Sequence, residues 1–376
     1  MSKVAGVIAE YNPVHKGHIY LASEIRKKFL DVGIISVMSG NFVQRGEPAV
    51  FDKKKRAVEA VSRGACDLIL EMPVIYSTSS AADFAFAGVN ILKGTGICDL
   101  LYFGSESGDI LSLQHISKTL SEFKKTIEEK IKEKIKSGIS YPVARSEVLK
   151  NYLTSSEIET LKGPNNILAL EYLKNIYEDS EIVPKTILRK GKGHNESGAF
   201  ERKKIFMKDE EFFNEREKRF FDMIRVSILS MTDSELNSFD HNGAGLPLRI
   251  RKLIRTSNSY EEFIKNVKTK RYTLTRIKRE ILHLLLKINQ RDINDKKLYI
   301  KPIAFNEKGA EMLRKIQDSN RKKLPIYDKI NKSVLEDKHM KRNLELEIRA
   351  TDFFNIIEGK ALYENSEYVQ NPVFIN

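Results

Sequence analysis

Two histidines on either side of a Lys-Gly pair are the residues in this sequence best placed for chemistry. His15 and His18 follow an apolar run, Val4–Ala9, and precede a stretch with helical spacing. They therefore lie at an expected helix N-terminus, where free backbone N–H groups and the helix dipole favour anions. Gly17 lets the backbone approach a ligand closely. Imidazoles placed here can donate hydrogen bonds to a triphosphate and stabilise the negative charge that grows on departing pyrophosphate.

Two other interpretations of this pair have to be weighed. The histidines could be exposed residues of an ordinary loop, because a His-x-Gly-His string is short. They could also bind zinc, but no third ligand lies nearby and the sequence has no Cys-x-x-Cys spacing. Their place directly between a strand and a helix favours the phosphate site, so we predict no resident metal. Magnesium is expected to arrive with ATP, although no carboxylate pair can be assigned to it.

The sequence around the pair alternates between two kinds of hydrophobic pattern, one typical of strands and one typical of helices. Strand-length apolar runs alternate with stretches of helical spacing, and a further run at Pro184–Arg189 could rejoin the same sheet. The runs are Val4–Ala9, Val32–Met38, Cys66–Leu70 and Asp99–Phe103, and the helical stretches are Ile19–Phe29, Asp52–Arg63 and Ser79–Leu92. This alternation predicts an α/β fold with a doubly wound, Rossmann-like parallel sheet. Ligands of such sheets bind at the carboxyl ends of the strands.

The second half of the chain has a different character. From about Leu111 the pattern becomes helical, residues 196–219 are highly charged, and helical spacing continues to about Ile356. We therefore expect two domains, residues 1–200 carrying the catalytic core and residues 201–376 forming a mainly helical, basic domain. The apolar tail Tyr368–Asn376 is expected to dock on the body of the protein.

Composition narrows the class of protein. The 376 residues contain 64 Lys and Arg against 51 Asp and Glu, a net charge of +13, which suits a polyanionic partner but also suits solubility alone. No apolar run approaches the roughly 18 residues that span a bilayer, and the first run is too short for a signal peptide. Cys66 and Cys98 lie inside apolar runs, so a disulfide scaffold is excluded. These features predict a cytoplasmic protein with no membrane partner; they do not indicate an oligomeric state.

The place of the charge is more specific than its amount. Residues 249–279 contain eleven basic side chains and only two acidic ones, with Tyr260, Phe263 and Tyr272 between them. Cations interleaved with aromatics suit the phosphate backbone and unstacked bases of an RNA loop. The plainer alternative is a solvated basic helix face. We predict an RNA-binding segment here.

The string from Ile8 to His18, Ile-Ala-Glu-Tyr-Asn-Pro-Val-His-Lys-Gly-His, carries a family resemblance. His-x-Gly-His after the first strand resembles the nucleotidyltransferase superfamily, which includes the class I aminoacyl-tRNA synthetases. The fuller string is similar to the bacterial tRNA(Met) cytidine acetate ligase family. Further stretches that fit this family are Met38–Ala49, Tyr102–Glu106, Pro164–Ala169, Thr269–Thr273 and Phe305–Gly309. The resemblance thus covers nearly the whole chain.

The resemblance implies a reaction in two steps. Acetate attacks the α-phosphate of ATP and forms acetyl-adenylate and pyrophosphate. The exocyclic amine of the wobble cytidine in elongator tRNA(Met) then takes the acetyl group and becomes N4-acetylcytidine. ATP, acetate and tRNA are therefore the expected substrates.

The predicted site residues follow from this resemblance together with their places in the strand-to-helix loops. His15 and His18 are expected to be catalytic. The expected ATP-binding residues are Val7, Ile8, Ala9, Glu10, Tyr11, Asn12, Pro13, Val14, Lys16, Gly17, Ile19, Tyr20, Gly104, Asn166, Arg189 and Lys190. The expected tRNA-binding residues are Arg45, Lys270, Arg271, Tyr272, Arg276, Lys278 and Arg279. One of the neighbouring residues Asn165 and Asn166 is expected to cap the following helix, the resemblance assigns the other to the nucleotide, and we prefer Asn166 for that role.

One departure from the family pattern keeps other functions open. The second nucleotidyltransferase signature is matched only by Ser197–Arg202, Ser-Gly-Ala-Phe-Glu-Arg, which has Ala199 where a Thr hydroxyl is expected. Either Arg202 with Lys203 and Lys204 suffices for the triphosphate, or the adenylation step is weakened. A small-molecule adenylyltransferase, and an RNA-binding protein with a degenerate nucleotide site, remain alternatives.

Overall fold

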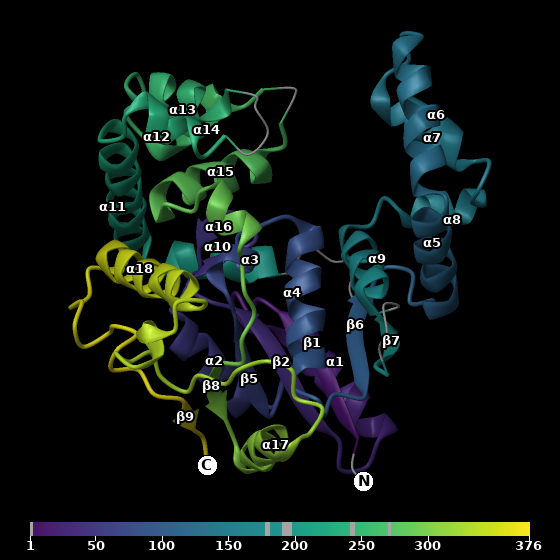
Figure 1. Ribbon diagram of the computed structural model, residues 1–376, viewed down its shortest axis with the longest axis vertical. Helices are drawn as coiled ribbons and strands as arrows, with labels where there is room; N and C mark the ends of the chain where they lie inside the picture. The colour runs from purple at the N-terminus through teal and green to yellow at the C-terminus, as the bar shows by residue number, and fades with distance from the viewer. Residues whose placement is uncertain (1–2, 177–180, 190–197, 241–244, 270–271) are drawn as a thin grey trace.

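A seven-stranded sheet forms the centre of the protein, in the order β7-β6-β1-β2-β5-β8-β9 (Figure 1). The computed structural model describes residues 3–176, 181–189, 198–240, 245–269 and 272–376, without the side chains of residues 141 and 142. The strands are β1 (Val4–Ala9), β2 (Gly33–Ser39), β5 (Leu68–Met72), β6 (Leu100–Ser105), β7 (Val183–Leu188), β8 (Pro302–Phe305) and β9 (Val373–Phe374). The first five are parallel, whereas β8 runs antiparallel to β5. The predicted doubly wound parallel sheet is confirmed.

Helices cover both faces of this sheet, which explains why its strands are apolar along their whole length. Alternate side chains point to opposite faces. Ala5 and Ile34 pack in one cluster with α1 (Lys16–Lys28) and α2 (Lys53–Ser62). Ile35 packs in the other cluster, with α4 (Ala81–Gly94).

The remaining helices of the first half project from the carboxyl edge of the sheet. They follow β5 and β6 and form the lobe at the upper right of Figure 1, except α3 and α9, which lie near the sheet. They are α3 (Val74–Ser77), α5 (Ile110–Glu122), α6 (Lys124–Lys136), α7 (Tyr141–Leu149), α8 (Ser155–Thr160) and α9 (Pro164–Ile176). A short hairpin, β3 (Phe42–Val43) and β4 (Glu47–Pro48), follows β2.

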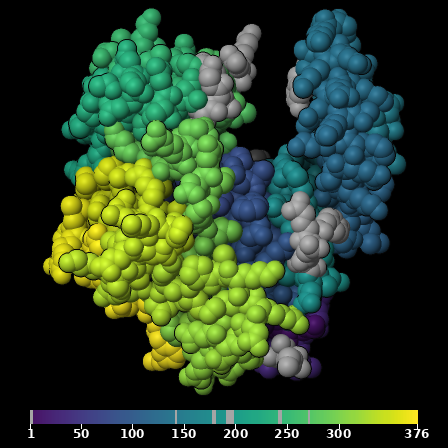
Figure 2. Space-filling model, viewed as in Figure 1, coloured from purple at the N-terminus to yellow at the C-terminus, as the bar shows by residue number. Residues whose placement is uncertain are grey.

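The second half is mostly helical, as expected. Its helices are α10 (Gly198–Lys208), α11 (Glu210–Leu229), α12 (Asp233–Asn237), α13 (Leu246–Ile254), α14 (Tyr260–Val267), α15 (Leu274–Leu286), α16 (Gln290–Asn294), α17 (Glu307–Asp318), the 3-10 turn Val334–Glu336 and α18 (Lys341–Glu358). Helices α12–α15 form a second lobe, and Figure 2 shows a broad hollow between it and the lobe of α5–α8. No described helix is long and apolar enough to cross a membrane.

The second half also returns to the sheet. Strand β8 pairs with β5, and the tail adds β9 at the edge, where the Ile375 N–H donates to the Phe305 carbonyl at 2.9 Å. The tail therefore docks as expected. A boundary at residue 200 does not coincide with the edge of the sheet, because two strands lie beyond it. Neither strand was predicted, since each is short and one begins with proline.

A ring of four buried charges joins these distant segments. Lys53 lies 2.6 Å from Glu71, and Lys301 lies 2.6 Å from both Glu71 and Glu367. Lys53 also pairs with Glu367, and Thr351 donates its hydroxyl to the same carboxylate. Burial alone would raise the pKa of Glu367, but the two lysines hold it well below its ordinary value. The ring links α2, β5, the segment before β8 and the segment that leads into the tail, and Thr351 adds α18 to this set.

Removing one member of this ring should destabilise the whole protein. Glu367→Ala leaves two buried lysines that share Glu71 as an ion-pair partner, and a broken buried pair costs about 3–5 kcal/mol. Urea unfolding should show this loss, whereas Glu364→Ala, at an exposed position three residues earlier, should change the free energy of unfolding by under about 0.5 kcal/mol. Equal effects of the two substitutions would show that the ring is not a stabilising link.

Candidate nucleotide site

A cavity of about 190 Å³ opens at the carboxyl ends of β1, β6 and β7. Both predicted catalytic histidines line it, together with residues from the ends of the strands and from α1 and α9. Of the predicted ATP-binding residues, those on its walls are Val7, Ile8, Ala9, Gly17, Tyr20, Gly104 and Arg189. The structure thus brings the predicted loops together at one edge of the sheet.

Both histidines accept a backbone hydrogen bond at the N-terminus of α1. The Gly17 N–H donates to His15 Nδ1 at 3.1 Å, and the His15 N–H donates to His18 Nδ1 at 3.2 Å. The rings stack with centroids 3.8 Å apart. An imidazole whose Nδ1 accepts a hydrogen bond carries its proton on Nε2 when it is neutral. Each ring therefore offers an Nε2–H donor to a ligand.

Both rings are held neutral by their surroundings. Burial lowers the pKa of His15 to about 4, and the Arg189 and Arg202 cations act in the same direction. Burial also holds the pKa of His18 well below its ordinary value, with His15 and Arg189 adding to the effect. The site therefore presents neutral donors at pH 7, and cations beside them are available to match the charge of an anion.

Helix α10 reaches this site from the second half of the chain. A Cβ on Gly198, its first residue, would lie 3.5 Å from His15 Cδ2, so the N-terminus of α10 faces the histidine. Arg202 on the same helix donates from Nη1 to the Asn12 carbonyl at 2.9 Å. The helix of the degenerate second signature thus occupies the expected place, with Arg202 present and no hydroxyl at Ala199. Ser197 lies outside the described residues.

The structure separates the two neighbouring asparagines. Asn166 is buried, and its amide accepts from the Glu106 N–H at 2.9 Å and donates to the Thr160 carbonyl at 3.0 Å. Asn165 lines the cavity instead, and its Oδ1 accepts from Arg189 at 3.1 Å. Asn166 therefore supports the loop after β6, and the geometry favours Asn165 for ligand contact.

Most other predicted ATP residues shape the first loop and do not line the cavity. Glu10 accepts from the Gln44 N–H at 3.0 Å, and Asn12 accepts from the Val50 N–H at 2.8 Å. Tyr11 is buried and meets the His18 ring edge-on, with centroids 4.8 Å apart. Pro13 and Val14 are buried, Ile19 is half-buried and Lys16 is exposed. Lys190 lies outside the described residues.

Two features of the site were not predicted. Leu168 and Tyr172 of α9 complete one wall, and their only sequence signal is the apolar side of a helix. Arg56 of α2 is fully buried and donates to the carbonyls of Glu10, Ser39 and Gly40, which joins the first loop to the second. No sequence pattern distinguishes this arginine from a surface residue of α2.

The predicted tRNA residues fall into two groups. Arg45 is exposed at the hairpin turn, and Arg276 lies 4.7 Å over the Tyr272 ring. Lys278 is paired with Glu47, and Arg279 donates to the Gln44 carbonyl at 3.5 Å, so these two residues fasten α15 to the hairpin. Lys270 and Arg271 lie outside the described residues.

The aromatic residues of the basic segment belong to the core of the helical lobe. Tyr272, Tyr260 and Phe263 are only 7 %, 8 % and 0 % exposed. Buried rings cannot stack on RNA bases, so the interpretation of these aromatics as a stacking surface does not fit the structure. Any RNA contact by this segment has to come from its cations.

No group of three or more metal-ligating side chains occurs within the described ranges. The groups that the site offers to a ligand are two Nε2–H groups, the N-terminus of α10, and the guanidinium groups of Arg189 and Arg202. This set suits a triphosphate, because it places hydrogen bonds and positive charge where phosphate oxygens would lie.

Comparison with known proteins decides the family. A model of the family described as HIGH Nucleotidyl Transferase matches residues 2–206 and 200–368. Proteins named tRNA(Met) cytidine acetate ligase match the chain along its length, at 37 % identity over 96 % of each chain in Thermoanaerobacter sp. (strain X514). The relative from Acetivibrio thermocellus is 33 % identical over 99 % of this chain and 100 % of its own. The chain belongs to the tRNA(Met) cytidine acetate ligase family.

Solved structures agree with this assignment to the acetate ligase family. Thermotoga maritima TmcAL, in its apo form and in a form bound with alpha-thio ATP, matches with a TM-score of 0.85 and 30 % identity over 99 % of both chains. The resemblance drawn from Ile8–His18 is confirmed, and so is the fold that it implied.

Titration of the two histidines tests the geometry of the site. NMR of the ligand-free protein should show both neutral rings as Nε2–H tautomers, with the midpoint of His15 near 4. Because the pKa values are lowered in the folded state, the unfolded chain binds more protons below about pH 6.5, and stability should fall as the pH falls through this range. An Nδ1–H tautomer, or a His15 midpoint near 6.5, would contradict the capping arrangement.

Proposed function

We propose that this protein is an ATP-dependent ligase that activates acetate and acetylates the wobble cytidine of elongator tRNA(Met) to N4-acetylcytidine. The proposal rests on one observation. His15 and His18 are neutral, their Nδ1 atoms accept backbone hydrogen bonds, and they lie at the N-terminus of α10. The names of the relatives, and the alpha-thio ATP bound by the Thermotoga maritima protein, support the choice of substrates.

In the first step an oxygen of acetate attacks the α-phosphorus of ATP, and the bond to the β-phosphate breaks. The charge that grows on pyrophosphate would be met by the Nε2–H groups of His15 and His18 and by Arg202. Arg189, at the end of β7, is placed to bind another phosphate oxygen. Such positioned donors act without any covalent bond to the protein. Magnesium would enter with ATP and neutralise part of the triphosphate charge.

In the second step the exocyclic amine attacks the acetyl carbon, the C–N bond forms, AMP leaves and the amine loses a proton. We assign tRNA binding to cations of the hairpin and the helical lobe, including the exposed Arg45 and the half-buried Arg276. The hollow between the two lobes in Figure 2 gives an RNA room to approach. We place the reaction in the cytoplasm, where tRNA is found. The assignment of residues 1–200 to the nucleotide and 201–376 to tRNA is likewise a proposal, with α10 serving both.

Pyrophosphate exchange into ATP tests this proposal. Exchange should depend on acetate, and His15→Asn with His18→Asn should lower it at least about 100-fold, since losing one such donor costs 10²–10³ in rate. Asparagine keeps an acceptor for the cap but has no group at the Nε2 position. His115→Asn, at an exposed position on α5, serves as the matched control and should leave exchange unchanged.

Each other outcome points to a different function. Exchange that needs a phosphate ester and ignores acetate would indicate a small-molecule adenylyltransferase. Absence of exchange together with retained tRNA binding would indicate a degenerate nucleotide site. Loss of exchange and tRNA binding together in the double variant would show that the histidines are structural.

A further inference from the structure

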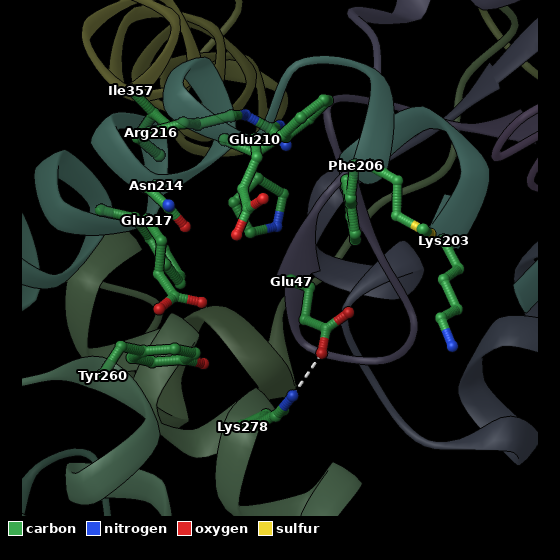
Figure 3. A pocket seen from close by; sticks show the side chains of 14 residues that line it. Glu47, Lys203, Phe206, Glu210, Asn214, Arg216, Glu217, Tyr260, Lys278 and Ile357 are labelled. Atoms are coloured by element: carbon green, nitrogen blue, oxygen red, sulfur yellow. Dashed lines mark hydrogen bonds and ion pairs between the residues drawn. The ribbon is translucent and has the colours of Figure 1, made fainter.

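A second cavity, of about 440 Å³, lies where α10 and α11 meet the β3–β4 hairpin (Figure 3). Its other walls come from α14, α15 and α18. None of its lining residues lines the nucleotide cavity. The adenylation step leaves this cavity without a role.

One part of its wall is aromatic. The rings of Phe206 and Phe213 lie 4.5 Å apart, and those of Phe220 and Tyr260 lie 5.3 Å apart. Phe206 remains 40 % exposed and Met207 72 % exposed. A ligand with a flat, apolar face can cover such an exposed apolar surface and pack against the rings beside it.

The polar part of the wall includes three carboxylates. Figure 3 shows the carboxylates of Glu47, Glu210 and Glu217 directed into a common space. Lys278 is already paired with Glu47. Within the described parts of the chain, no N–H or O–H group donates to the carboxylates of Glu210 and Glu217. Burial, and then the neighbouring Glu261 carboxylate, raise the pKa of Glu217.

A second cation of the wall, Arg216, is also engaged, whereas the third, Lys203, is exposed. Arg216 pairs with Glu358 and donates to the Ala49 carbonyl. With these two pairs formed, the carboxylates of Glu210 and Glu217 outnumber the one remaining lining cation, Lys203, and this excess of acceptors disfavours phosphate or acetate as the ligand. The ligand that fits has a planar face for the rings and N–H donors at its edge. A nucleobase with an exocyclic amine meets both needs, because carboxylates accept from such amines and aromatic rings stack on bases.

The position of the cavity points to the same ligand. Helix α10 begins beside His15 and carries the cavity residue Phe206 eight residues later, about 12 Å along the helix axis. A single RNA strand that presents one base to the nucleotide site can therefore place a base in this cavity as well.

We propose that this cavity binds an unstacked, amine-bearing base of the tRNA substrate, with Glu217 accepting from the amine and Phe206 stacking on the ring. The inference rests on the proposed function, since it takes tRNA as the RNA that is bound. It adds two contacts that would select which RNA loop enters the enzyme.

Equilibrium binding of an elongator tRNA(Met) transcript, measured by filter binding without ATP, tests these contacts. Glu217→Ala and Phe206→Ala should each raise the Kd about tenfold, which corresponds to about 1.4 kcal/mol. Phe206→Tyr keeps the ring and should bind like the parent protein. Glu211→Ala removes an equal charge from the exposed surface of α11 and should not raise the Kd.

Acetate-dependent pyrophosphate exchange, measured on the same variants, should stay within about twofold of the parent. A Glu217→Ala protein that binds like Glu211→Ala would overturn the proposal. Loss of exchange in Phe206→Ala would show that this substitution displaces α10 from the nucleotide site. The Glu217→Ala result alone would then decide the proposal. Absence of exchange in the parent protein would contradict the proposed function, while the binding comparison would still decide the fate of this cavity.

Discussion

The hydrogen bonds that the backbone gives to the Nδ1 atoms of His15 and His18 are the constraint on which the nucleotide site depends. An N-terminal cap needs an acceptor, and an imidazole can accept only while it is neutral. Capping, burial and the nearby arginines thus all favour the same protonation state. The outcome is a pair of fixed donors whose charge does not depend on pH near neutrality, set at the positive end of a helix.

The same site shows why the two halves of the chain cannot act separately. Arg202 and the N-terminus of α10 come from beyond residue 197, yet they reach the first loop at Asn12 and His15. The buried ring of Lys53, Glu71, Lys301 and Glu367 joins the halves through the sheet. A helical lobe anchored in this way can bind RNA while α10 stays fixed beside the phosphates.

The sequence predicted the parts of the fold that are set by local pattern. The bounds of β1 follow from one apolar run that ends at Glu10, and the histidine loop follows from its place between that run and a helix. Lys301 and Glu367 carried no such signal, because each looks like a surface residue until its buried partner is seen. Asn165 and Asn166 have the same chemistry, so only the fold could tell which one faces the cavity.

The basic segment shows the limit of composition as a guide. Eleven cations interleaved with aromatic residues suggested a stacking surface for bases, but helical periodicity buries Tyr260 and Phe263 of α14, and Tyr272, which precedes α15, is buried as well. The charged residues of this lobe lie toward its outside, and its aromatic residues lie inside. An aromatic surface beside hydrogen-bond acceptors occurs instead at α10 and α11. The sequence pattern of that stretch indicated only its high charge.

Mass spectrometry of tRNA nucleosides, after the purified protein is incubated with ATP, ¹³C-labelled acetate and elongator tRNA(Met), shows whether the protein transfers acetate to cytidine. We expect N4-acetylcytidine that carries the label, formed together with equal amounts of AMP and pyrophosphate. Unlabelled or absent acetylcytidine, or cleavage of ATP to ADP, would contradict it.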